Sequence, residues 1–288
     1  MNELSLGIVV VTGASSGIGQ ASAHELARRG FHVLATIRKA ADADRLGNVN
    51  IEPFLLDITD EAGIAALAKR IADDPQRRPL RGLINNAGVG MNAPVETLPL
   101  ADWRRLFEIN LFGHIAMIQA LLPMLIESAG TVVNISSVGG KVAMAGYGPY
   151  AATKFGMEAI SDSLRREVAP LGVKVVVIEP GAVVTEMLER VDKVGAKVID
   201  DMTPPQRSRY AAMMQAVVAQ AQAAVPRGAS AEQAGKVVAD AVTSRRPKTR
   251  YTIGRDAAII VRMIRFISDR SLDRLLAAGL KPYRKQAS

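Results

Sequence analysis

Six short apolar runs, rich in valine and isoleucine, recur along the first 180 residues, with helical patterns between most of them. Runs of this length are typical of strands that are buried on both faces of a sheet. Strands that alternate with helices predict a doubly wound parallel sheet with helices on both faces, which is an α/β fold. The runs span 6–11, 32–37, 51–56, 83–88, 131–135 and 173–178.

The longest helical pattern, from Asp102 to Glu127, carries apolar residues around most of its circumference. A helix that is apolar on most sides is buried on most sides. One side is expected to pack on the sheet and the other against a second subunit, as in a homodimer or homotetramer. Asn110 is the polar exception. Because a buried amide must be hydrogen-bonded, we expect Asn110 to be either a structural bridge or part of a proton path.

The turn after the first run is rich in glycine and leads directly into a helical pattern. Its spacing is G-x-x-x-G-x-G, with the glycines at Gly13, Gly17 and Gly19. Glycines are needed where the backbone turns tightly and where a pyrophosphate approaches the N–H groups at a helix N-terminus. The turn therefore predicts a dinucleotide site, although a purely structural turn would use the same glycines.

Two cations follow the second run. In a dinucleotide fold the residues at this strand end face the adenosine ribose. A carboxylate there accepts hydrogen bonds from a free 2′-hydroxyl, whereas a cation there accommodates a 2′-phosphate. Positions 36 to 39 contain no acidic residue, and two of them are the cations Arg38 and Lys39. We therefore expect NADP(H) rather than NAD(H), with Arg38 as the main phosphate contact. The alternative is a pair of solvated surface cations.

The composition fits one domain over 1–288. Of the 288 residues 49% are hydrophobic, which is enough to bury a sizeable core. The absence of cysteine excludes disulfides and thiolate metal ligands. No apolar segment approaches the ~18 residues of a membrane span, and the N-terminus lacks a basic region before an apolar run. We expect a soluble, intracellular and cytoplasmic protein.

The net charge of +8 is concentrated near the C-terminus. Residues 203–288 carry 16 Lys and Arg against 5 Asp and Glu, whereas residues 1–202 carry 20 against 23. A basic segment of this kind can favour nucleic acid, an anionic membrane surface or solubility. Solubility is the default interpretation, and we expect no nucleic-acid partner.

The candidate chemistry lies in Tyr150 and Lys154, which are four residues apart and share one face of a helix. A cation one turn away from a phenol stabilises the phenolate, so we expect the pKa of Tyr150 to be lowered toward neutral pH. Ser137 ends the fifth run, and the 13 residues that separate it from Tyr150 allow the loop to return its hydroxyl beside the phenol. This pattern predicts proton exchange with a substrate oxygen.

Two other kinds of chemistry are not supported. Ser136 and Ser137 lack a G-x-S-x-G setting, and no histidine is placed to activate them, so a hydrolase is not expected. His24-Glu25 is not followed by a second histidine four residues later, and no metal site is expected. We interpret His24, His32 and His114 as structural.

Together these segments, from about 6 to 187, resemble the short-chain dehydrogenase/reductase family in its single-domain branch. The resemblance rests on separated elements in the order and spacing of that family. They are the Gly13, Gly17 and Gly19 turn, Asp57, Asn85-Asn86-Ala87-Gly88, Asn110, Ser137, Tyr150, Lys154 and Pro180-Gly181. The resemblance implies a Rossmann-like fold and an NADP(H)-dependent oxidoreductase that interconverts an alcohol and its carbonyl.

The resemblance also implies roles for individual residues. Asp57 is expected to contact the adenine, Asn86 the ribose side of the cofactor and Thr185 the nicotinamide end. Lys154 is expected to contact the nicotinamide ribose, and Asn110 to hold a water that links Lys154 to solvent. Further cofactor contacts are expected from Ser15, Ser16, Ile18, Ile58, Ala87, Gly88, Pro180, Gly181 and Val183.

In the implied mechanism Ser137 orients and polarises the substrate oxygen, Tyr150 transfers the proton and Lys154 lowers the pKa of the tyrosine. Two alternatives remain open. One is a non-catalytic dinucleotide-binding sensor or scaffold. The other is a sugar-nucleotide epimerase or dehydratase of the same superfamily, although such proteins usually have another glycine spacing.

The C-terminal part, 188–288, is expected to determine substrate specificity, with 186–225 as a mobile lid. Ser230 followed by Gln233 predicts a capped helix start, and 250–254 predicts an edge strand. This part weakly resembles that of hydroxysteroid and retinol dehydrogenases, which implies a bulky apolar alcohol or ketone.

The last helical pattern spans 257–285 and mixes apolar residues with arginines, among them Arg262, Arg265 and Arg270. A basic apolar helix can lie on an anionic membrane, pack on a partner subunit or close over the substrate pocket. Packing is the default, and weak peripheral membrane contact is the sharper hypothesis.

Overall fold

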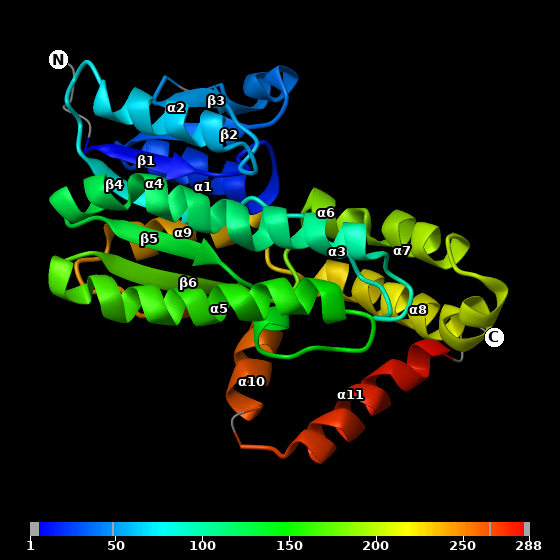
Figure 1. The fold of residues 1–288 in the computed structure, drawn as a ribbon. Coiled ribbons are helices and arrows are strands. Elements are labelled where there is room, and N and C mark those ends of the chain that lie inside the picture. The colour runs from blue at the N-terminus through cyan, green and yellow to red at the C-terminus, as the bar shows by residue number, and fades with distance from the viewer. Residues whose placement is uncertain (1–5, 48, 265, 285–288) are drawn as a thin grey trace.

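The computed structural model describes residues 6–47, 49–264 and 266–284, and these form one seven-stranded sheet (Figure 1). The strand order is β3-β2-β1-β4-β5-β6-β7, and every neighbouring pair is parallel. This confirms the predicted doubly wound sheet, including the edge strand β7. The strands are β1 Ile8–Val11, β2 His32–Ile37, β3 Ile51–Leu55, β4 Leu80–Asn85, β5 Thr131–Ile135, β6 Lys174–Pro180 and β7 Arg250–Ile253.

Helices cover both faces of the sheet because successive strand residues point to opposite sides. Val9 and Val11 pack with α1 and α9 on one face, while Ile8 and Val10 pack with α2, α4 and α5 on the other. The helices of the layers are α1 Gly17–Arg28, α2 Glu61–Ala72, α3 Leu100–Phe107, α4 Gly113–Glu127, α5 Gly148–Val168 and α9 Ala231–Thr243. The predicted cap of α9 is present, since Ser230 and Gln233 form a capping box.

The predicted helix over 102–127 is present as one continuous helix, Leu100–Glu127, with a π-helical turn in its middle. A π-helical turn, η2 (Glu108–Phe112), joins α3 to α4. The combined segment Leu100–Glu127 is, among the described residues, the one helix long and apolar enough to cross a membrane by length and composition. Its residues Met117, Leu121 and Leu125 are fully buried in the cluster beneath the sheet, as expected of a core helix.

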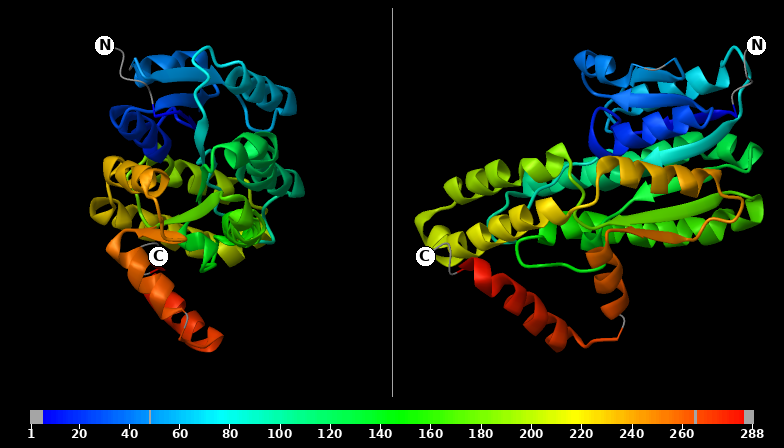
Figure 2. Two further views of the ribbon diagram at one scale, coloured as in Figure 1. Left: turned by 90° about the vertical axis from the view of Figure 1, so that its left-hand side faces the viewer. Right: turned by 180° about the vertical axis from the view of Figure 1, so that it is seen from behind.

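The segment expected to act as a lid folds into three helices, which lie beyond the C-terminal ends of the strands (Figures 1 and 2). They are α6 Glu186–Glu189, α7 Val191–Asp200 and α8 Pro204–Ala224. The loop 92–96 meets α8, because Glu96 accepts hydrogen bonds from Arg209 and from the Tyr210 hydroxyl.

The predicted single helix over 257–285 is wrong. Two helices occupy this range, α10 (Arg255–Met263) and α11 (Asp269–Arg284), and they form an arm that leaves the sheet after β7 and returns to α8 (Figures 1 and 2). The break has a local cause, since the Ser268 hydroxyl accepts from the Ser271 N–H and so caps the start of a new helix. Leu280 anchors the end of the arm against α8. Arg265 lies outside the described residues.

Candidate active site

The candidate site lies where the strand order reverses between β1 and β4. In open parallel sheets, ligands bind at the carboxyl ends of the strands on either side of this reversal. The turn 12–19 leaves β1 at that point, and the segment Asn85–Gly88 leaves β4 beside it.

The glycine turn has the conformation that a dinucleotide requires. Gly13 and Gly17 have φ of +64° and +57°, in the left-handed region that favours glycine. A Cβ on Gly13 would lie 2.8 Å from the Cα of Ala87, and one on Gly19 would overlap Asn86 and the Gly13 carbonyl. The turn ends at the N-terminus of α1, whose free N–H groups and dipole suit a pyrophosphate. The cradle therefore fits the predicted cofactor, with Ser15, Ser16 and Ile18 partly exposed within it.

Thr12 and Asn86 tie the two segments together. The Thr12 hydroxyl accepts from the N–H groups of Asn86 and Ala87 at 2.8 and 3.0 Å. The Asn86 amide donates back to the carbonyls of Thr12 and Gly13 at 2.9 and 3.1 Å. The Asn86 side chain thus holds the glycine turn in place. As a result, the backbone around Gly88 lies at the edge of the predicted cofactor site. Thr12 was missed in the sequence, although a hydroxyl at the first turn residue is a detectable signal.

The predicted adenosine contacts stand at the ends of β2 and β3. Arg38 and Lys39 are exposed directly after β2, so both guanidinium and ammonium are free to meet a phosphate there. Asp57 is exposed after β3, and its Oδ1 accepts from the N–H and the hydroxyl of Thr59 at 3.0 and 2.9 Å. Ile58 is buried.

Ser137 lies near Tyr150, as the loop length predicted, since the Ser137 hydroxyl and the Tyr150 ring both border Gly139. Ser137 follows β5, and its Oγ accepts from the Gly139 N–H at 3.0 Å. A Cβ on Gly139 would lie 3.3 Å from the Tyr150 ring, so the glycine lets the loop approach the phenol closely. The two hydroxyls can both contact one oxygen atom of a ligand, and one of them can transfer a proton to that oxygen.

The expected lowering of the Tyr150 pKa is wrong for the chain as described. Burial raises the pKa of Tyr150 to about 12, while the nearby Ser137 hydroxyl lowers it by less. Lys154 lies 5.7 Å from the centre of the Tyr150 ring and donates to the Ile135 carbonyl at 2.8 Å. Burial lowers the pKa of Lys154 to about 8. Tyr150 is therefore a phenol at neutral pH, suited to donating a proton.

Asn110 is a structural bridge. Its amide, carried by η2, donates to the Val89 carbonyl and accepts from the Val89 N–H, both at 2.9 Å, and donates to the Thr153 hydroxyl at 3.3 Å. These contacts fix the loop after Gly88 against α5, next to Lys154. The predicted water between Asn110 and Lys154 stays a prediction.

The remaining residues predicted to contact the cofactor follow β6. Pro180 ends that strand, and the Gly181 N–H donates to the Ile253 carbonyl of β7 at 2.9 Å. Val183 is buried. Thr185 faces the glycine turn, since a Cβ on Gly17 would lie 3.0 Å from its methyl group. Thr185 thus closes the cradle from the opposite side.

His114 has the structural role that was expected of it. It is fully buried on α4, and its Nε2 lies 2.7 Å from the Ala87 carbonyl. Burial and the charge of Lys154 lower the pKa of His114 to about 3, so the ring is neutral and Nε2–H donates. The histidine therefore fixes the Asn-Ala-Gly segment from below. Among the described residues, no group of histidines and carboxylates could hold a metal ion.

Several residues that the sequence did not single out pack against the loops after β4 and before α5. Burial raises the pKa of Tyr147, and the nearby Asn92 opposes that rise. Met187 approaches Gly90, where a Cβ would lie 3.4 Å from its side chain. Met213 and Met214 of α8 face Gly146 in the same way.

The fold, the glycine cradle and the serine–tyrosine–lysine group define a dinucleotide-dependent oxidoreductase. The chain belongs to the short-chain dehydrogenase/reductase family, since the family model described as short chain dehydrogenase matches residues 7–194. It is therefore an NAD(P)-dependent dehydrogenase or reductase acting on CH–OH groups, and the resemblance seen in the sequence is confirmed.

Three known proteins illustrate the likeness. Retinol dehydrogenase 5 of Mus musculus is 35% identical over 277 residues, which cover 93% of this chain and 87% of that protein. A short-chain dehydrogenase from Streptomyces avermitilis has a TM-score of 0.75 and 29% identity, covering 100% of this chain and 98% of its own. A short chain dehydrogenase from Burkholderia cenocepacia, solved in complex with NADP, has a TM-score of 0.72 and 25% identity, covering 94% and 98%.

Proposed function

We propose that the protein is an NADP(H)-dependent oxidoreductase that interconverts a bulky apolar alcohol and its carbonyl. The observation that carries the proposal is the grouping of Ser137, Tyr150 and Lys154 at the carboxyl edge of the sheet. Ser137 and Tyr150 both border Gly139, and the Lys154 ammonium lies 5.7 Å from the centre of the Tyr150 ring. A sensor or scaffold would have no need of this buried group. The alternative of an epimerase or dehydratase is less well supported, because the glycine spacing is that of the single-domain branch.

In the reductive direction each side chain has one task. The Ser137 hydroxyl donates to the carbonyl oxygen of the substrate, which orients and polarises it. Tyr150 gives its proton to that oxygen, which its raised pKa permits because the phenol is protonated at neutral pH. The Lys154 ammonium stabilises the phenolate that remains. When bound, the cofactor supplies the hydride.

The preference for NADP(H) rests on the cations after β2. Arg38 and Lys39 are exposed, and no carboxylate stands at 36 to 39. A guanidinium pairs well with a phosphate and has no favourable partner in a free 2′-hydroxyl. The relative from Burkholderia cenocepacia was solved with NADP.

The apolar substrate is supported by the methionines around the site. Met187, Met213 and Met214 face the loops that flank Tyr150, and methionine adapts to irregular apolar shapes. The relative named as a retinol dehydrogenase acts, by that name, on such an alcohol. We further propose a single domain, in which 6–187 bind the cofactor and 188–288 select the substrate.

We also propose a cytoplasmic homodimer or homotetramer with peripheral membrane contact. Phe112 on the π turn is 48% exposed beside an apolar helix, which supports a subunit contact. On the arm, Phe266 is 87% exposed and Ile259 64%, and Arg262, Arg270 and Arg274 are exposed near them. Apolar and basic side chains together favour an anionic membrane surface.

The proposal is tested by offering purified protein steroids, retinoids and aliphatic ketones with NADPH or NADH and following nicotinamide absorbance. We expect NADPH oxidation with at least one bulky apolar carbonyl and slower reaction with NADH. Binding of NADPH without turnover of any carbonyl or alcohol would favour the sensor. Turnover confined to sugar nucleotides would favour the epimerase or dehydratase.

A further inference from the structure

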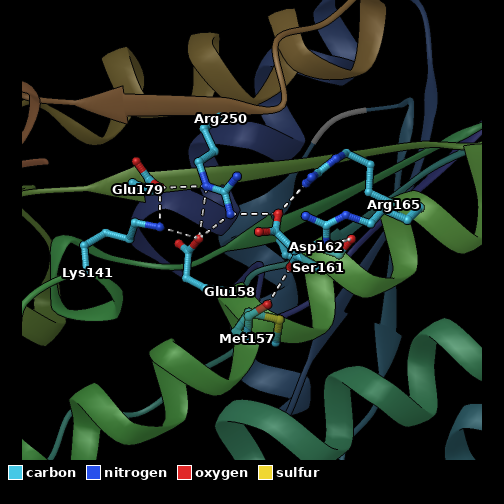
Figure 3. A network of polar contacts seen from close by, with 10 residues as sticks. Lys141, Met157, Glu158, Ser161, Asp162, Arg165, Glu179 and Arg250 are labelled. Carbon is cyan, nitrogen blue, oxygen red and sulfur yellow. Dashed lines mark hydrogen bonds and ion pairs between the residues drawn. The ribbon is translucent and has the colours of Figure 1, made fainter. Parts of the chain in front are cut away.

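A cluster of charged side chains gathers around Glu158 and Asp162 of α5 (Figure 3). Glu158 is one helical turn from Lys154, and both are buried, with 6% and 4% of their surface exposed. Glu179 of β6 lies opposite Glu158 and is also buried. Two carboxylates buried so close to a reacting group need an explanation, because burial of charge is costly.

Arg250 and Lys141 hold these carboxylates. The Arg250 guanidinium donates to Glu158 Oε2 at 3.0 and 3.2 Å and lies 3.2 Å from Glu179. It also donates to Asp162, one turn further along α5, at 2.8 Å. The Lys141 ammonium lies 3.4 Å from Glu158 and 3.8 Å from Glu179. The carboxylates thus sit in fixed positions between α5, β6, β7 and the turn after β5.

The charges of the cluster are not equally accessible to water. The side chains of Glu158 and Glu179 are 7% and 1% exposed, whereas those of Lys141 and Arg250 are 22% and 21% exposed. Water screens the two cations more than the two carboxylates. The two carboxylates are therefore the least screened charges of the cluster, and Glu158 stands one helical turn from Lys154.

The backbone also brings Glu158 close to the lysine turn. A Cβ on Gly140 would lie 2.6 Å from Ser136 Oγ, 3.1 Å from the Lys154 carbonyl and 3.2 Å from Glu158 Cγ. No larger residue fits between the loop and this part of α5. Among the described residues, Glu158 Oε1 has no hydrogen-bond partner, so part of its charge is not neutralised by a donor.

We propose that Glu158 is a positioning residue that keeps Lys154 in its charged form by presenting a fixed, poorly screened carboxylate one helical turn away. The inference rests on the proposed function, in which the ammonium of Lys154 stabilises the phenolate of Tyr150. It adds a residue that the mechanism above does not use. Arg250 and Lys141 serve this role indirectly, because they fix the carboxylate.

The other ionisable groups around Lys154 do not supply this charge. Tyr150 on the same helix is a phenol, and His114 on α4 is neutral because its pKa is lowered to about 3. Lys141 and Arg250 are paired with Glu158, and both also lie beside Glu179. Burial lowers the pKa of Lys154 to about 8, and the charge of Glu158 opposes that lowering.

The test is an NMR titration of the Lys154 Nζ in protein labelled with 13C,15N-lysine, assigned with Lys154→Met. Glu158→Gln removes the charge and keeps the shape, and Asp162→Asn is the matched control in the same cluster. With Glu158→Gln we expect the midpoint of Lys154 to fall by more than about half a pH unit. Asp162→Asn should leave the midpoint unchanged. Glu158→Asp keeps a carboxylate and should bring the midpoint most of the way back to the wild-type value.

An unchanged midpoint in Glu158→Gln would overturn the inference, as would an equal fall in Asp162→Asn, which would point to a general loosening of the cluster. If Glu158→Gln fails to fold, Glu158→Asp, which withdraws the carboxylate by one methylene, should still show a small fall in the midpoint and Asp162→Asn none, and equal midpoints in these two variants would overturn the inference. The titration needs no turnover. An absence of NADPH oxidation by the wild type would therefore refute the proposed function without touching this test.

Discussion

The ammonium nitrogen of Lys154 lies 5.7 Å from the centre of the Tyr150 ring. Lys154 is held in place by the Ile135 carbonyl, which accepts its hydrogen bond at 2.8 Å. The cation therefore acts on the phenol through space. Its effect on the reaction should be largest when negative charge develops on Tyr150.

Tyr150→Phe removes the proton donor and keeps the ring. We expect kcat to fall by at least about 100-fold, which is typical for loss of a general acid, with little change in the dissociation constant of NADPH. Steady-state kinetics and fluorescence titration measure the two quantities. Tyr251→Phe, on the distant strand β7, is the control and should keep its activity. Retention of more than about a tenth of the wild-type kcat would contradict the assigned role, since that is a barrier change under ~1.4 kcal/mol.

Lys154→Met should change how stability depends on pH. Because the folded-state pKa of Lys154, about 8, lies below the usual lysine value of 10.5, the unfolded chain binds more protons between these pH values. Wild-type stability thus gains from this group as pH rises from about 8 to 10.5, by about 3 kcal/mol at most. Urea unfolding at pH 7 and pH 10 should show that gain in the wild type and not in Lys154→Met. The exposed control Lys236→Met should follow the wild type, and parallel curves for all three proteins would refute the prediction.

Arg38→Asp should reverse or abolish the preference for NADPH. The change removes a charge-assisted contact and places a carboxylate where the 2′-phosphate is expected, which amounts to a few kcal/mol. We expect kcat/KM for NADPH to fall by about 100-fold or more relative to NADH. Arg246→Asp makes the same change of charge in the exposed loop between α9 and β7 and should leave the ratio unchanged. Equal kcat/KM values for the two cofactors in the wild type would refute the prediction.

Gly19→Ala should damage the glycine cradle. A Cβ at this position overlaps Asn86 and the Gly13 carbonyl, so the turn must shift away from the Asn86 segment. We expect a loss of roughly 1–3 kcal/mol in stability and a weaker NADPH affinity, measured by urea unfolding and calorimetry. Gly47→Ala is the control, because a Cβ there lies 3.6 Å from its nearest neighbour. Equal effects of the two substitutions would contradict the close packing of the cradle.

The arm should bind anionic vesicles weakly and in a salt-sensitive way. Each Lys or Arg near an anionic surface contributes about 1 kcal/mol, so several together give measurable binding. Co-sedimentation with anionic and neutral vesicles at low and high salt measures it. Phe266→Ser should weaken the binding, whereas Leu171→Ser, which changes an exposed apolar residue far from the arm, should not. Absence of binding to anionic vesicles at low salt would assign the arm to packing.

The sheet could be predicted from the sequence because a parallel strand buried on both faces is apolar at nearly every position. The run of Ile8 to Val11, for example, has no polar residue, and both of its faces are covered by helices. Turns were equally readable, since Gly13 and Gly17 mark positions with positive φ. Strands and turns of this kind depend on residues that are close together in the chain, so the sequence pattern reveals them directly.

The electrostatics of the site could not be predicted in the same way. Spacing alone places Lys154 beside Tyr150, but burial decides the direction of the pKa shift, and burial depends on helices far away in the chain. Glu158 could have been noticed four residues after Lys154. Its partner Arg250 is 92 residues distant, and only the folded sheet brings the two together.

The two-helix arm was missed for another reason. Apolar residues recur at helical spacing within 257–285, so the pattern gives no sign of a break. The break lies near Ser268, whose hydroxyl accepts a hydrogen bond from the backbone and so caps the start of the second helix. The pattern therefore predicted the right kind of structure and the wrong continuity.

The π turn at Glu108–Phe112 carries a consequence for how this site could arise or be lost. A π turn holds one residue more than an α turn, and each helical residue rotates the chain by about 100°. Deleting one residue from η2 would restore a regular helix and swing α3 and its loop around the axis relative to α4. Asn110 would then leave Val89 and Thr153, which it now joins. A deletion of one codon would thus convert this chain into one with a regular helix. That helix could pack on the same sheet but would lack the Asn110 bridge.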